Sequence, residues 1–263
     1  MLTNKRIVLT GATSGIGLEI LKLLVQADNK ILAVGRRIEK LDGFDKNKVI
    51  PFKCDVSSAQ SVDLIFEEAI EKLGGIDIYY CNAGFSYYEE FDYVDWGKIE
   101  KLFATNVFTA MYSYQKYYDY LNGKDGQFAM TLSAMGKMAM PGYTIYTASK
   151  FALHGFQQAI RLEKHNNIKM TCLYPVATDT EFFKENADKK FKKPFPVQKP
   201  ITVAKAMVKG LGKKKKTVNP CKLFVVSEVL MKFFPFMKNI YWSMEYKKYK
   251  TFIDATKNGG DKL

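Results

Sequence analysis

The sequence predicts an α/β fold in a single domain: a doubly wound parallel sheet, followed by a basic, amphipathic C-terminal extension. Two observations support this prediction. Short apolar runs alternate with longer helical patterns from the first residues onward, and 47% of the 263 residues are hydrophobic, with 14% aromatic. This composition is sufficient for one large core and argues against disorder. A doubly wound domain can reach this length without dividing into two.

The predicted elements alternate along the chain as a parallel sheet requires. Apolar runs typical of strands lie at residues 6–10, 30–34, 49–53, 76–81, 127–133 and 169–174, with a short candidate at 217–219. Helical patterns lie at residues 16–25, 62–73, 95–120, 144–165 and 203–211. Because helical crossovers separate the strands, we expect the strands to run parallel, with helices on both faces.

A glycine-rich segment lies between the first predicted strand and the first predicted helix. Gly11 permits a tight turn, while Gly15 and Gly17 lack a Cβ and let a pyrophosphate reach the backbone N–H groups at the helix N-terminus. The strand-to-helix position favours a Rossmann-type dinucleotide site over an ordinary loop. The expected contacts are Gly11, Thr13, Ser14, Gly15, Ile16 and Gly17.

The end of the second predicted strand indicates which dinucleotide binds. A ribose 2′ group would lie there, and the sequence places Arg36 and Arg37 at this point, with no acidic residue to accept bonds from a 2′-hydroxyl. Arginine suits a 2′-phosphate. We therefore predict NADP(H) as the cofactor, with a pair of surface arginines as the alternative.

Two further segments end predicted strands on the same edge of the sheet. Asp55 and Val56 follow the third strand, where a short carboxylate could accept a bond from an adenine amine. The small residues Asn82, Ala83 and Gly84 follow the fourth strand. Because open α/β sheets bind ligands at this edge, we expect both segments to contact the nucleotide.

A tyrosine and a lysine four residues apart lie on one face of a helix, which places an ammonium beside a phenol. The same spacing recurs elsewhere in this chain, so spacing alone proves nothing. Tyr146 and Lys150 are distinguished by their position near the start of a predicted helix, 13 residues after Ser133, which ends a predicted strand. This position selects Tyr146 and Lys150 over the other pairs of the same spacing.

Together these residues resemble the short-chain dehydrogenase/reductase family, in its compact subgroup, over nearly the whole chain to about Thr180. The residues that match the family's motifs in order are the glycine segment, Asn82-Ala83-Gly84, Asn106, Ser133, Tyr146 and Lys150. The resemblance implies that Tyr146 gives its proton to the nascent alkoxide and that Lys150 lowers the tyrosine pKa and grips the nicotinamide ribose. It also implies that Ser133 binds the substrate oxygen and that Asn106 holds a water relay behind Lys150.

The chain departs from the family pattern after the sixth predicted strand. The family usually carries a Pro-Gly pair there, whereas Pro175 is followed by Val176 in this sequence. Backbone freedom beside the nicotinamide is therefore expected to be lower. Pro175 and Thr180 remain expected cofactor contacts, with Thr180 bonding to the carboxamide or the pyrophosphate.

Flexible thioethers and aromatic rings follow the predicted catalytic segments. Met135, Met140 and Tyr143 follow Ser133, and Phe182 follows Thr180. Such residues make an adaptable apolar pocket for a bulky carbonyl compound, with ordinary core packing as the alternative. The sequence does not identify the substrate.

The chain divides into two regions on this interpretation. Residues 1–220 form the dinucleotide-binding and catalytic domain, with a substrate loop at about 176–212, and residues 221–263 form an amphipathic helical extension. The apolar segment 223–242 is interrupted by Glu228 and Pro235 among others, so a membrane span is not expected. This extension could close the substrate site, pack between subunits or rest on a membrane surface.

Charge and cysteine content indicate what the protein could contact and in which compartment it lies. Residues 184–263 hold 20 Lys and 6 acidic residues, whereas residues 1–183 hold 20 basic and 21 acidic residues. The basic region could contact an anionic membrane surface or nucleic acid, or be only a solvated face; specific binding of nucleic acid is not expected. Four separated cysteines and no leader segment point to a reducing cytoplasm, and two isolated histidines give no metal site.

The predicted function is that of an NADPH-dependent carbonyl reductase or alcohol dehydrogenase acting on a mainly apolar ketone or secondary alcohol. Hydride transfer is the chemistry of the cofactor. A catalytically silent NADP-binding sensor and a membrane-surface-associated interaction protein are the alternatives. We expect a homodimer or homotetramer in the cytoplasm. Peripheral contact with a membrane is expected if the C-terminal extension rests on a membrane surface.

Overall fold

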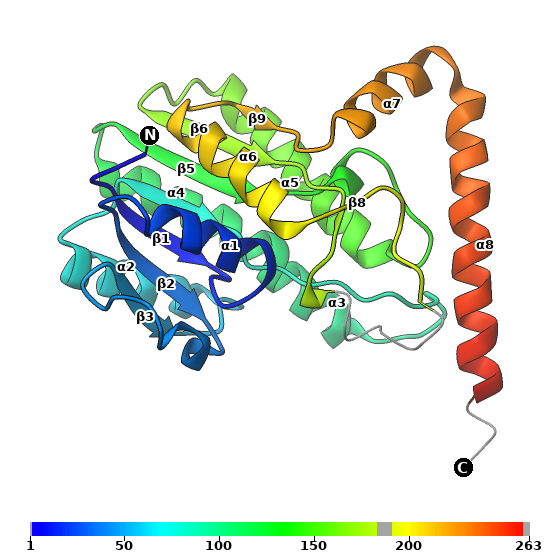
Figure 1. The fold of residues 1–263 in the computed structure, drawn as a ribbon, viewed down its shortest axis with the longest axis horizontal. Coiled ribbons are helices and arrows are strands. Elements are labelled where there is room, and N and C mark those ends of the chain that lie inside the picture. Colours follow the sequence, from blue (N-terminus) through cyan, green and yellow to red (C-terminus); the bar gives the residue numbers. More distant parts are fainter. Residues whose placement is uncertain (1, 183–190, 260–263) are drawn as a thin grey trace.

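The structure, a computed structural model, describes residues 2–182 and 191–259, and its centre is one parallel sheet of seven strands (Figure 1). The strands are β1 (Arg6–Thr10), β2 (Lys30–Gly35), β3 (Val49–Lys53), β4 (Ile78–Cys81), β5 (Gly126–Thr131), β6 (Ile168–Leu173) and β9 (Thr217–Val218). Their order across the sheet is β3-β2-β1-β4-β5-β6-β9. The order reverses after β3, so the sheet is doubly wound, and the predicted fold class is confirmed.

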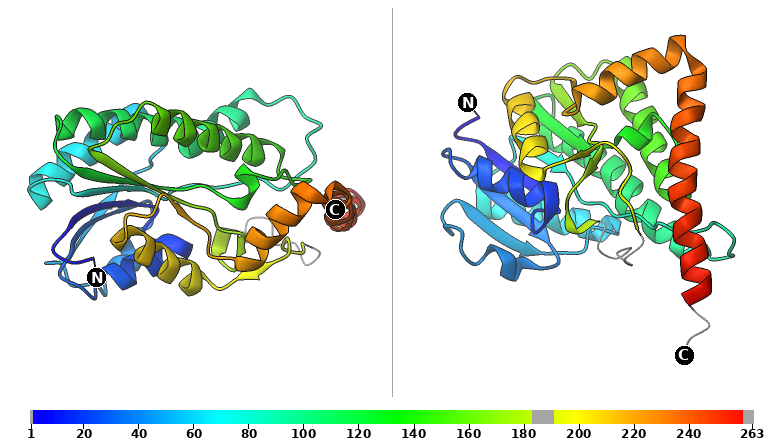
Figure 2. Two further views of the ribbon diagram at one scale, coloured as in Figure 1. Left: turned by 90° about the horizontal axis from the view of Figure 1, so that it is seen from above. Right: turned by 45° about the vertical axis from the view of Figure 1, so that its right-hand side comes forward.

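Helices cover both faces of this sheet, as the edge-on view in Figure 2 shows. The flanking helices are α1 (Gly15–Leu24), α2 (Ala59–Leu73), α4 (Thr109–Leu121), α5 (Thr144–Leu162) and α6 (Pro200–Gly212). Successive strand residues point to opposite faces, so Val8 packs in the core beneath α2, α4 and α5, while Ile7 and Leu9 pack beneath α1 and α6. Strands buried on both faces require the continuous apolar runs seen in the sequence.

The helix expected at residues 95–120 is interrupted. Asp95 begins α3 (Trp96–Phe103) by accepting a hydrogen bond from the N–H of Lys98 at 3.0 Å. A π-helical segment, Ala104–Phe108, then separates α3 from α4. Such one-turn insertions are often found at functional sites, and this one contains the buried Asn106.

The expected substrate loop at 176–212 contains more structure than its sequence indicates. Two short strands, β7 (Ala177–Thr178) and β8 (Val197–Gln198), pair with each other in parallel. Helix α6 then begins at Pro200, because proline at the first helical position lacks only an N–H that would be unpaired in any case. Residues 183–190 of this loop lie outside the described residues.

The C-terminal extension consists of two helices instead of one. α7 (Lys222–Phe233) ends at Phe234, whose backbone is not helical, and α8 (Pro235–Gly259) begins at the next residue. The ring of Pro235 disfavours helical geometry in the residue before it, which explains the break. In Figure 1, α8 runs along one side of the molecule. Over the described residues, none of the helices combines the length and apolar character that crossing a bilayer demands.

Candidate active site

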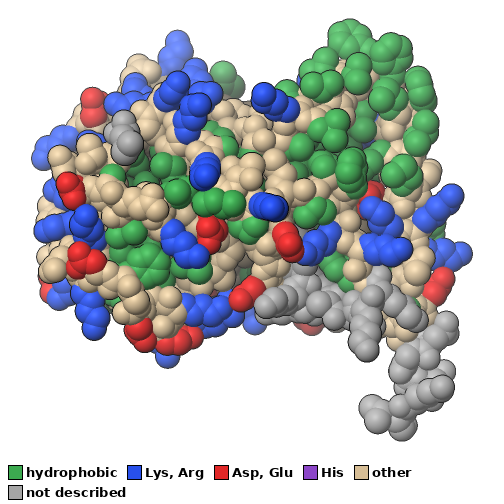
Figure 3. All heavy atoms as spheres, in the orientation of Figure 1, with side chains coloured by type: hydrophobic (Ala, Val, Ile, Leu, Met, Phe, Trp, Pro, Cys, Tyr) green, Lys and Arg blue, Asp and Glu red, His purple; other side chains and the backbone are tan. Residues whose placement is uncertain are grey.

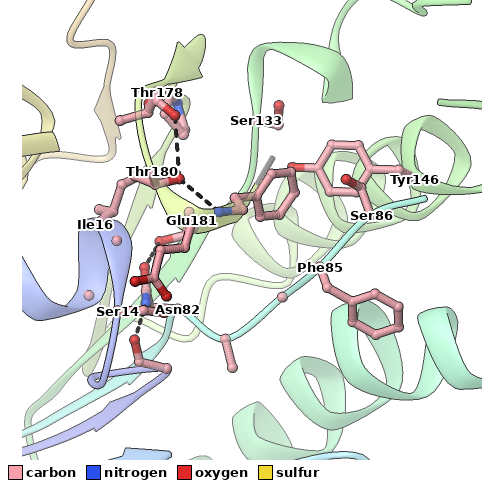
Figure 4. A pocket seen from close by; sticks show the side chains of 18 of the residues that line it. Ser14, Ile16, Asn82, Phe85, Ser86, Ser133, Tyr146, Thr178, Thr180 and Glu181 are labelled. Atoms are coloured by element: carbon pink, nitrogen blue, oxygen red, sulfur yellow. Dashed lines mark hydrogen bonds between the residues drawn. The ribbon is translucent and has the colours of Figure 1, made fainter. Parts of the chain in front are cut away.

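A pocket opens at the carboxyl edge of the sheet, where the loops after several strands meet. Its wall includes residues that follow β1, β4, β5 and β6, although these lie far apart in the sequence. In Figure 4, Ser14 and Ile16 lie on one side and Ser133 and Tyr146 on the other. Proposed cofactor and catalytic residues therefore share one pocket, at the position where doubly wound sheets bind ligands.

The glycine segment forms a close-packed cradle at one side of this pocket. Gly11 has φ +65°, which favours glycine, and a Cβ on Gly17 would collide with the carbonyl oxygen of Gly11. Ser14 precedes α1, yet its side chain makes no capping hydrogen bond, and the first turn contains no acidic residue. The N-terminus of α1 thus presents unpaired backbone N–H groups to the pocket, as an anion such as pyrophosphate requires.

Asn82 connects this cradle to the neighbouring strands. Its Nδ2 donates to the carbonyl oxygens of Thr10 and Gly11 at 3.1 and 3.3 Å, and its Oδ1 accepts from the hydroxyl of Thr131 at 2.9 Å. The loops after β1, β4 and β5 are therefore tied together by one amide. Ala83 and Gly84, the next two residues, line the pocket beside it.

Tyr146 and Ser133 form the opposite wall. Tyr146 is buried, and this burial raises the pKa of its phenol to about 12, while a hydrogen bond with Ser133 acts in the lowering direction. The hydroxyl of Ser133 also accepts from the N–H of Met135 at 3.0 Å. A neutral phenol beside a second hydroxyl is an arrangement that can bind and protonate a substrate oxygen.

Lys150 lies on the same helix as Tyr146, one turn further on. Its Nζ donates to the carbonyl oxygen of Thr131 at 2.9 Å and lies 5.5 Å from the centroid of the Tyr146 ring. Burial lowers the pKa of Lys150 to about 8. The sequence predicted a lowered tyrosine pKa; in this structure desolvation exceeds the opposing contributions, and the pKa of Tyr146 is raised.

Asn106 lies behind the pocket wall and shapes it indirectly. Its Oδ1 accepts from the N–H of Phe85 at 3.1 Å, and its Nδ2 donates to the carbonyl oxygen of Phe85 at 2.9 Å and to Ser149 Oγ at 3.3 Å. The π-helical segment thereby clamps the backbone that follows Gly84. Asn106 is expected to position this loop, whereas its role in a water relay stays a prediction.

The two arginines after β2 differ in their surroundings. Both line the pocket. Arg37 forms an ion pair with Glu181 at 3.1 Å, and Glu181 also pairs with Lys40. Arg36 forms no ion pair within the described residues. Arg36 is therefore the better-placed group for a phosphate, because Arg37 would have to share its charge with a carboxylate.

Several predicted contacts do not line the pocket. Thr13 is buried against Gly35 at the end of β2, Asp55 is exposed, Val56 packs in the core beneath α2, and Met140 packs in an aromatic cluster. The wall contains other residues that sequence reasoning did not select: Phe85, Ser86, Thr131, Leu132, Ala177, Thr178 and Glu181. Phe85 and Ser86 directly follow the Asn82-Ala83-Gly84 segment, and that adjacency could have identified them.

Aromatic rings close the end of the pocket beside Tyr146. Met135, Tyr143 and Phe182 line it, and the ring centroids of Tyr146 and Phe182 are 5.6 Å apart in an edge-to-face arrangement. Tyr143 packs on Tyr88 at 4.7 Å, and Tyr88 packs on Phe252 of α8 at 4.9 Å. Helix α8 therefore supports the pocket wall through two layers of rings.

Val176, where glycine was expected, lines the pocket beside Pro175 and Thr180. Its backbone does not adopt a positive φ, so a branched side chain causes no strain. The side chain is buried in a small cluster with Cys221 and Phe224 of the extension. The hydroxyl of Thr180 donates to the carbonyl oxygen of Thr178 and accepts from the N–H of Phe182, both at 3.3 Å.

In residues 2–182 and 191–259, no group of three or more His, Cys, Asp or Glu side chains gathers at metal-binding distance. The polar groups that line the pocket are hydroxyl, amide, ammonium, guanidinium, carboxylate and backbone N–H groups.

The sequence matches known families over most of its length. Residues 5–190 match the family model described as short chain dehydrogenase. A 3-ketodihydrosphingosine reductase from Bos taurus is 33% identical over 227 residues, which cover 79% of this chain and 68% of that protein. An uncharacterized oxidoreductase from Escherichia coli is 31% identical over 185 residues, 68% of each protein.

Solved structures show the same fold. A short chain dehydrogenase/reductase from Burkholderia phymatum in complex with NAD has a TM-score of 0.76 and 17% identity, covering 88% of this chain and 95% of that one. A short chain dehydrogenase from Burkholderia cenocepacia in complex with NADP has a TM-score of 0.72 and 21% identity, covering 83% and 96%. At these identities the likeness concerns the fold alone.

Proposed function

Because this chain belongs to the short-chain dehydrogenase/reductase family, an oxidoreductase family acting on CH–OH and C=O groups, we propose that it is an NADPH-dependent carbonyl reductase for a mainly apolar ketone. The reverse reaction would oxidise the corresponding secondary alcohol. The observation on which the proposal rests is the position of Tyr146 and Lys150 on one helix face at the wall of a pocket that also contains the N-terminus of α1.

The residues present fit a nicotinamide dinucleotide. The α1 N-terminus and Gly17, where a Cβ would collide with the Gly11 carbonyl, would hold the pyrophosphate. Lys150, which lines the same pocket as Gly84, would hold the ribose. When bound, the cofactor supplies a hydride to the carbonyl carbon. Side chains of this protein would donate the proton, orient the substrate and stabilise the phenolate.

Tyr146 would donate its phenolic proton to the carbonyl oxygen as negative charge develops there. Its raised pKa keeps the phenol protonated at neutral pH, as a proton donor must be. Ser133 would donate a hydrogen bond to the same oxygen and orient the substrate. The ammonium of Lys150, fixed by the Thr131 carbonyl, would favour the phenolate that remains after proton transfer.

The preference for NADPH over NADH is part of the proposal. It is supported by Arg36, which lines the pocket and forms no ion pair with another described residue, and by the absence of an acidic residue at the end of β2. A guanidinium can bind a 2′-phosphate with two parallel hydrogen bonds. Arg37 would assist only if its pairing with Glu181 were rearranged.

An apolar ketone is proposed as the substrate because the catalytic end of the pocket is lined by Met135, Tyr143 and Phe182. Rings and a thioether form this wall, and Lys150, the ammonium that lines the pocket beside Tyr146, is assigned to the phenol and the ribose. One relative is named as a 3-ketodihydrosphingosine reductase, so that ketone belongs among the compounds to be tested.

The experiment is to follow NADPH consumption with aliphatic, aryl, β-keto and steroid ketones and with 3-ketodihydrosphingosine. Turnover of at least one apolar ketone that is lost in Tyr146→Phe would support the proposal. Tight NADPH binding with no turnover of any compound would contradict it and favour a silent NADP-binding sensor.

A further inference from the structure

The outward side of the C-terminal extension is unusually apolar. We define the α7–α8 face as the exposed side chains of residues 223–244. Along α7 it includes Val226 and Phe233, and along α8 it includes Phe236, Ile240 and Met244, all exposed. Phe233 is 76% exposed and Phe236 is 60% exposed. In Figure 3 these two helices form the largest gathering of hydrophobic side chains on the side of the molecule shown.

This face remains exposed although the inner sides of both helices are attached to the domain. Phe224 of α7 is buried against Val176. Glu228 of α7 forms an ion pair with Lys137 at 2.8 Å, and Trp242 Nε1 of α8 donates to the carbonyl oxygen of Ala139 at 2.8 Å. The helices are thus held in place by contacts on one side only. Rotation to bury Phe233 would break these contacts, so the face needs another environment.

The spacing of the exposed residues shows that the face is continuous on each helix. Val226, Leu230 and Phe233 are four and three residues apart, and Phe236, Ile240 and Met244 are four apart, so each set lies on one side of its helix. Contiguous apolar surfaces of this kind mark sites of interaction with proteins or membranes.

The charges around the face select between these two partners. Residues 222–250 contain six Lys and two Glu. Both carboxylates are already paired, Glu228 with Lys137 and Glu245 with Lys248. A second copy docked on this face would bring exposed lysines such as Lys222 and Lys247 toward one another, with no unpaired carboxylate between residues 222 and 250 to offset them. An anionic lipid surface, by contrast, offers both an apolar interior and negative charge.

We propose that the α7–α8 face binds the surface of an anionic bilayer, with Phe233 and Phe236 inserted at the level of the acyl chains. Lys222 and Lys247 are exposed on the same sides of their helices as Val226 and Met244, and would lie at the headgroups. The corner between the two helices is the part that enters most deeply, because the two phenylalanines flank the break at Pro235. Amphipathic helices bind in this manner without spanning the membrane. The proposal does not depend on the substrate or on the cofactor.

The test is flotation of the full chain with lipid vesicles, either phosphatidylcholine alone or with about one-third phosphatidylserine. We expect binding to the anionic vesicles, weakened by salt. Phe233→Ser/Phe236→Ser should weaken it by on the order of 10-fold or more, because each ring loses its apolar burial. Lys222→Gln/Lys247→Gln should weaken binding to the anionic vesicles by about 5-fold per charge and leave binding to neutral vesicles unchanged.

Matched controls are Trp96→Ser, which removes an equally exposed ring from α3, and Lys124→Gln at a distant turn. Neither should change vesicle binding, and circular dichroism should show that every variant is folded. Absence of vesicle binding would overturn the proposal. So would an equal loss of vesicle binding in the control variants and in the variants of the α7–α8 face. A concentration-dependent dimer in light scattering that Phe233→Ser/Phe236→Ser abolishes would also overturn it and assign the face to a second copy.

Discussion

The ammonium of Lys150 lies 5.5 Å from the ring centroid of Tyr146, and both side chains are buried. Burial acts on the two groups in opposite directions: it lowers the pKa of Lys150 to about 8 and raises the pKa of Tyr146 to about 12. Both shifts favour the neutral form of each side chain. The site is therefore prepared to supply a proton from the phenol, while the lysine can be charged near neutral pH.

Tyr146→Phe should abolish carbonyl reduction while leaving NADPH affinity nearly unchanged. The substitution removes the proton donor and keeps the ring against Phe182. Steady-state rates together with NADPH titration by fluorescence would measure the two effects separately. A Phe variant that kept most of the wild-type rate would show that another group protonates the substrate.

Lys150→Ala should impair both turnover and NADPH binding, since one ammonium is proposed to serve the phenol and the ribose. The substitution also removes the hydrogen bond from Lys150 to the Thr131 carbonyl, which joins α5 to the end of β5 at the pocket wall. The same pair of measurements applies, and an effect confined to either turnover or binding would contradict the dual role.

The stability of the cofactor-free protein should reveal the buried charge of Lys150 through its pH dependence. The folded-state pKa of about 8 is below the ordinary value of 10.5, so the unfolded chain binds more protons between these values. The free energy of unfolding of the wild type should therefore rise with pH across this window, relative to Lys150→Met, by on the order of 3 kcal/mol.

Urea unfolding of both proteins at several pH values between neutrality and about pH 10 would measure this difference. The lost bond to Thr131 contributes a constant offset, so the informative quantity is the slope against pH. Lys124→Met, at an exposed site, should show no such slope. A difference between Lys150→Met and wild type that does not depend on pH would mean that Lys150 is not desolvated.

Arg36→Asp should sharply lower or invert the preference for NADPH over NADH. The charge-assisted bonds of one well-placed arginine to phosphate contribute about 1.5 to 3 kcal/mol, or roughly 10-fold to 150-fold in affinity. The introduced carboxylate would repel the 2′-phosphate and could accept a bond from a 2′-hydroxyl. The measurement is kcat/KM for both cofactors.

Arg37→Asp is the matched comparison, because Arg37 already pairs with Glu181. We expect a smaller change in the cofactor ratio than for Arg36→Asp. Equal use of NADH and NADPH by the wild type, or a ratio insensitive to both substitutions, would show that the arginines are surface charges.

The fold and much of the site could be predicted because their signals are local. Apolar runs define the strands, and the glycine segment and Tyr146 with Lys150 lie within short stretches of sequence. The break before Pro235 was not predicted, although proline disfavours helical geometry in the residue that precedes it. By contrast, the pairing of Arg37 with Glu181 joins residues 144 positions apart and depends on how two loops meet. The exposure of Asp55 also depends on how its loop is placed in the fold, and the residues beside it in the sequence do not indicate it.

The ring contacts between α8 and the pocket have a consequence for how relatives of this chain diverge. The matched family segment ends at residue 190, whereas Phe252, which supports Tyr143 through Tyr88, lies beyond it. Two proteins can therefore share every reactive group and still present different walls to a substrate. The wall itself lies within the matched segment, but part of its support lies outside it. Exchanging residues 221–259 between relatives should therefore alter which substrates the proposed pocket accepts and leave Tyr146 and Lys150 in place.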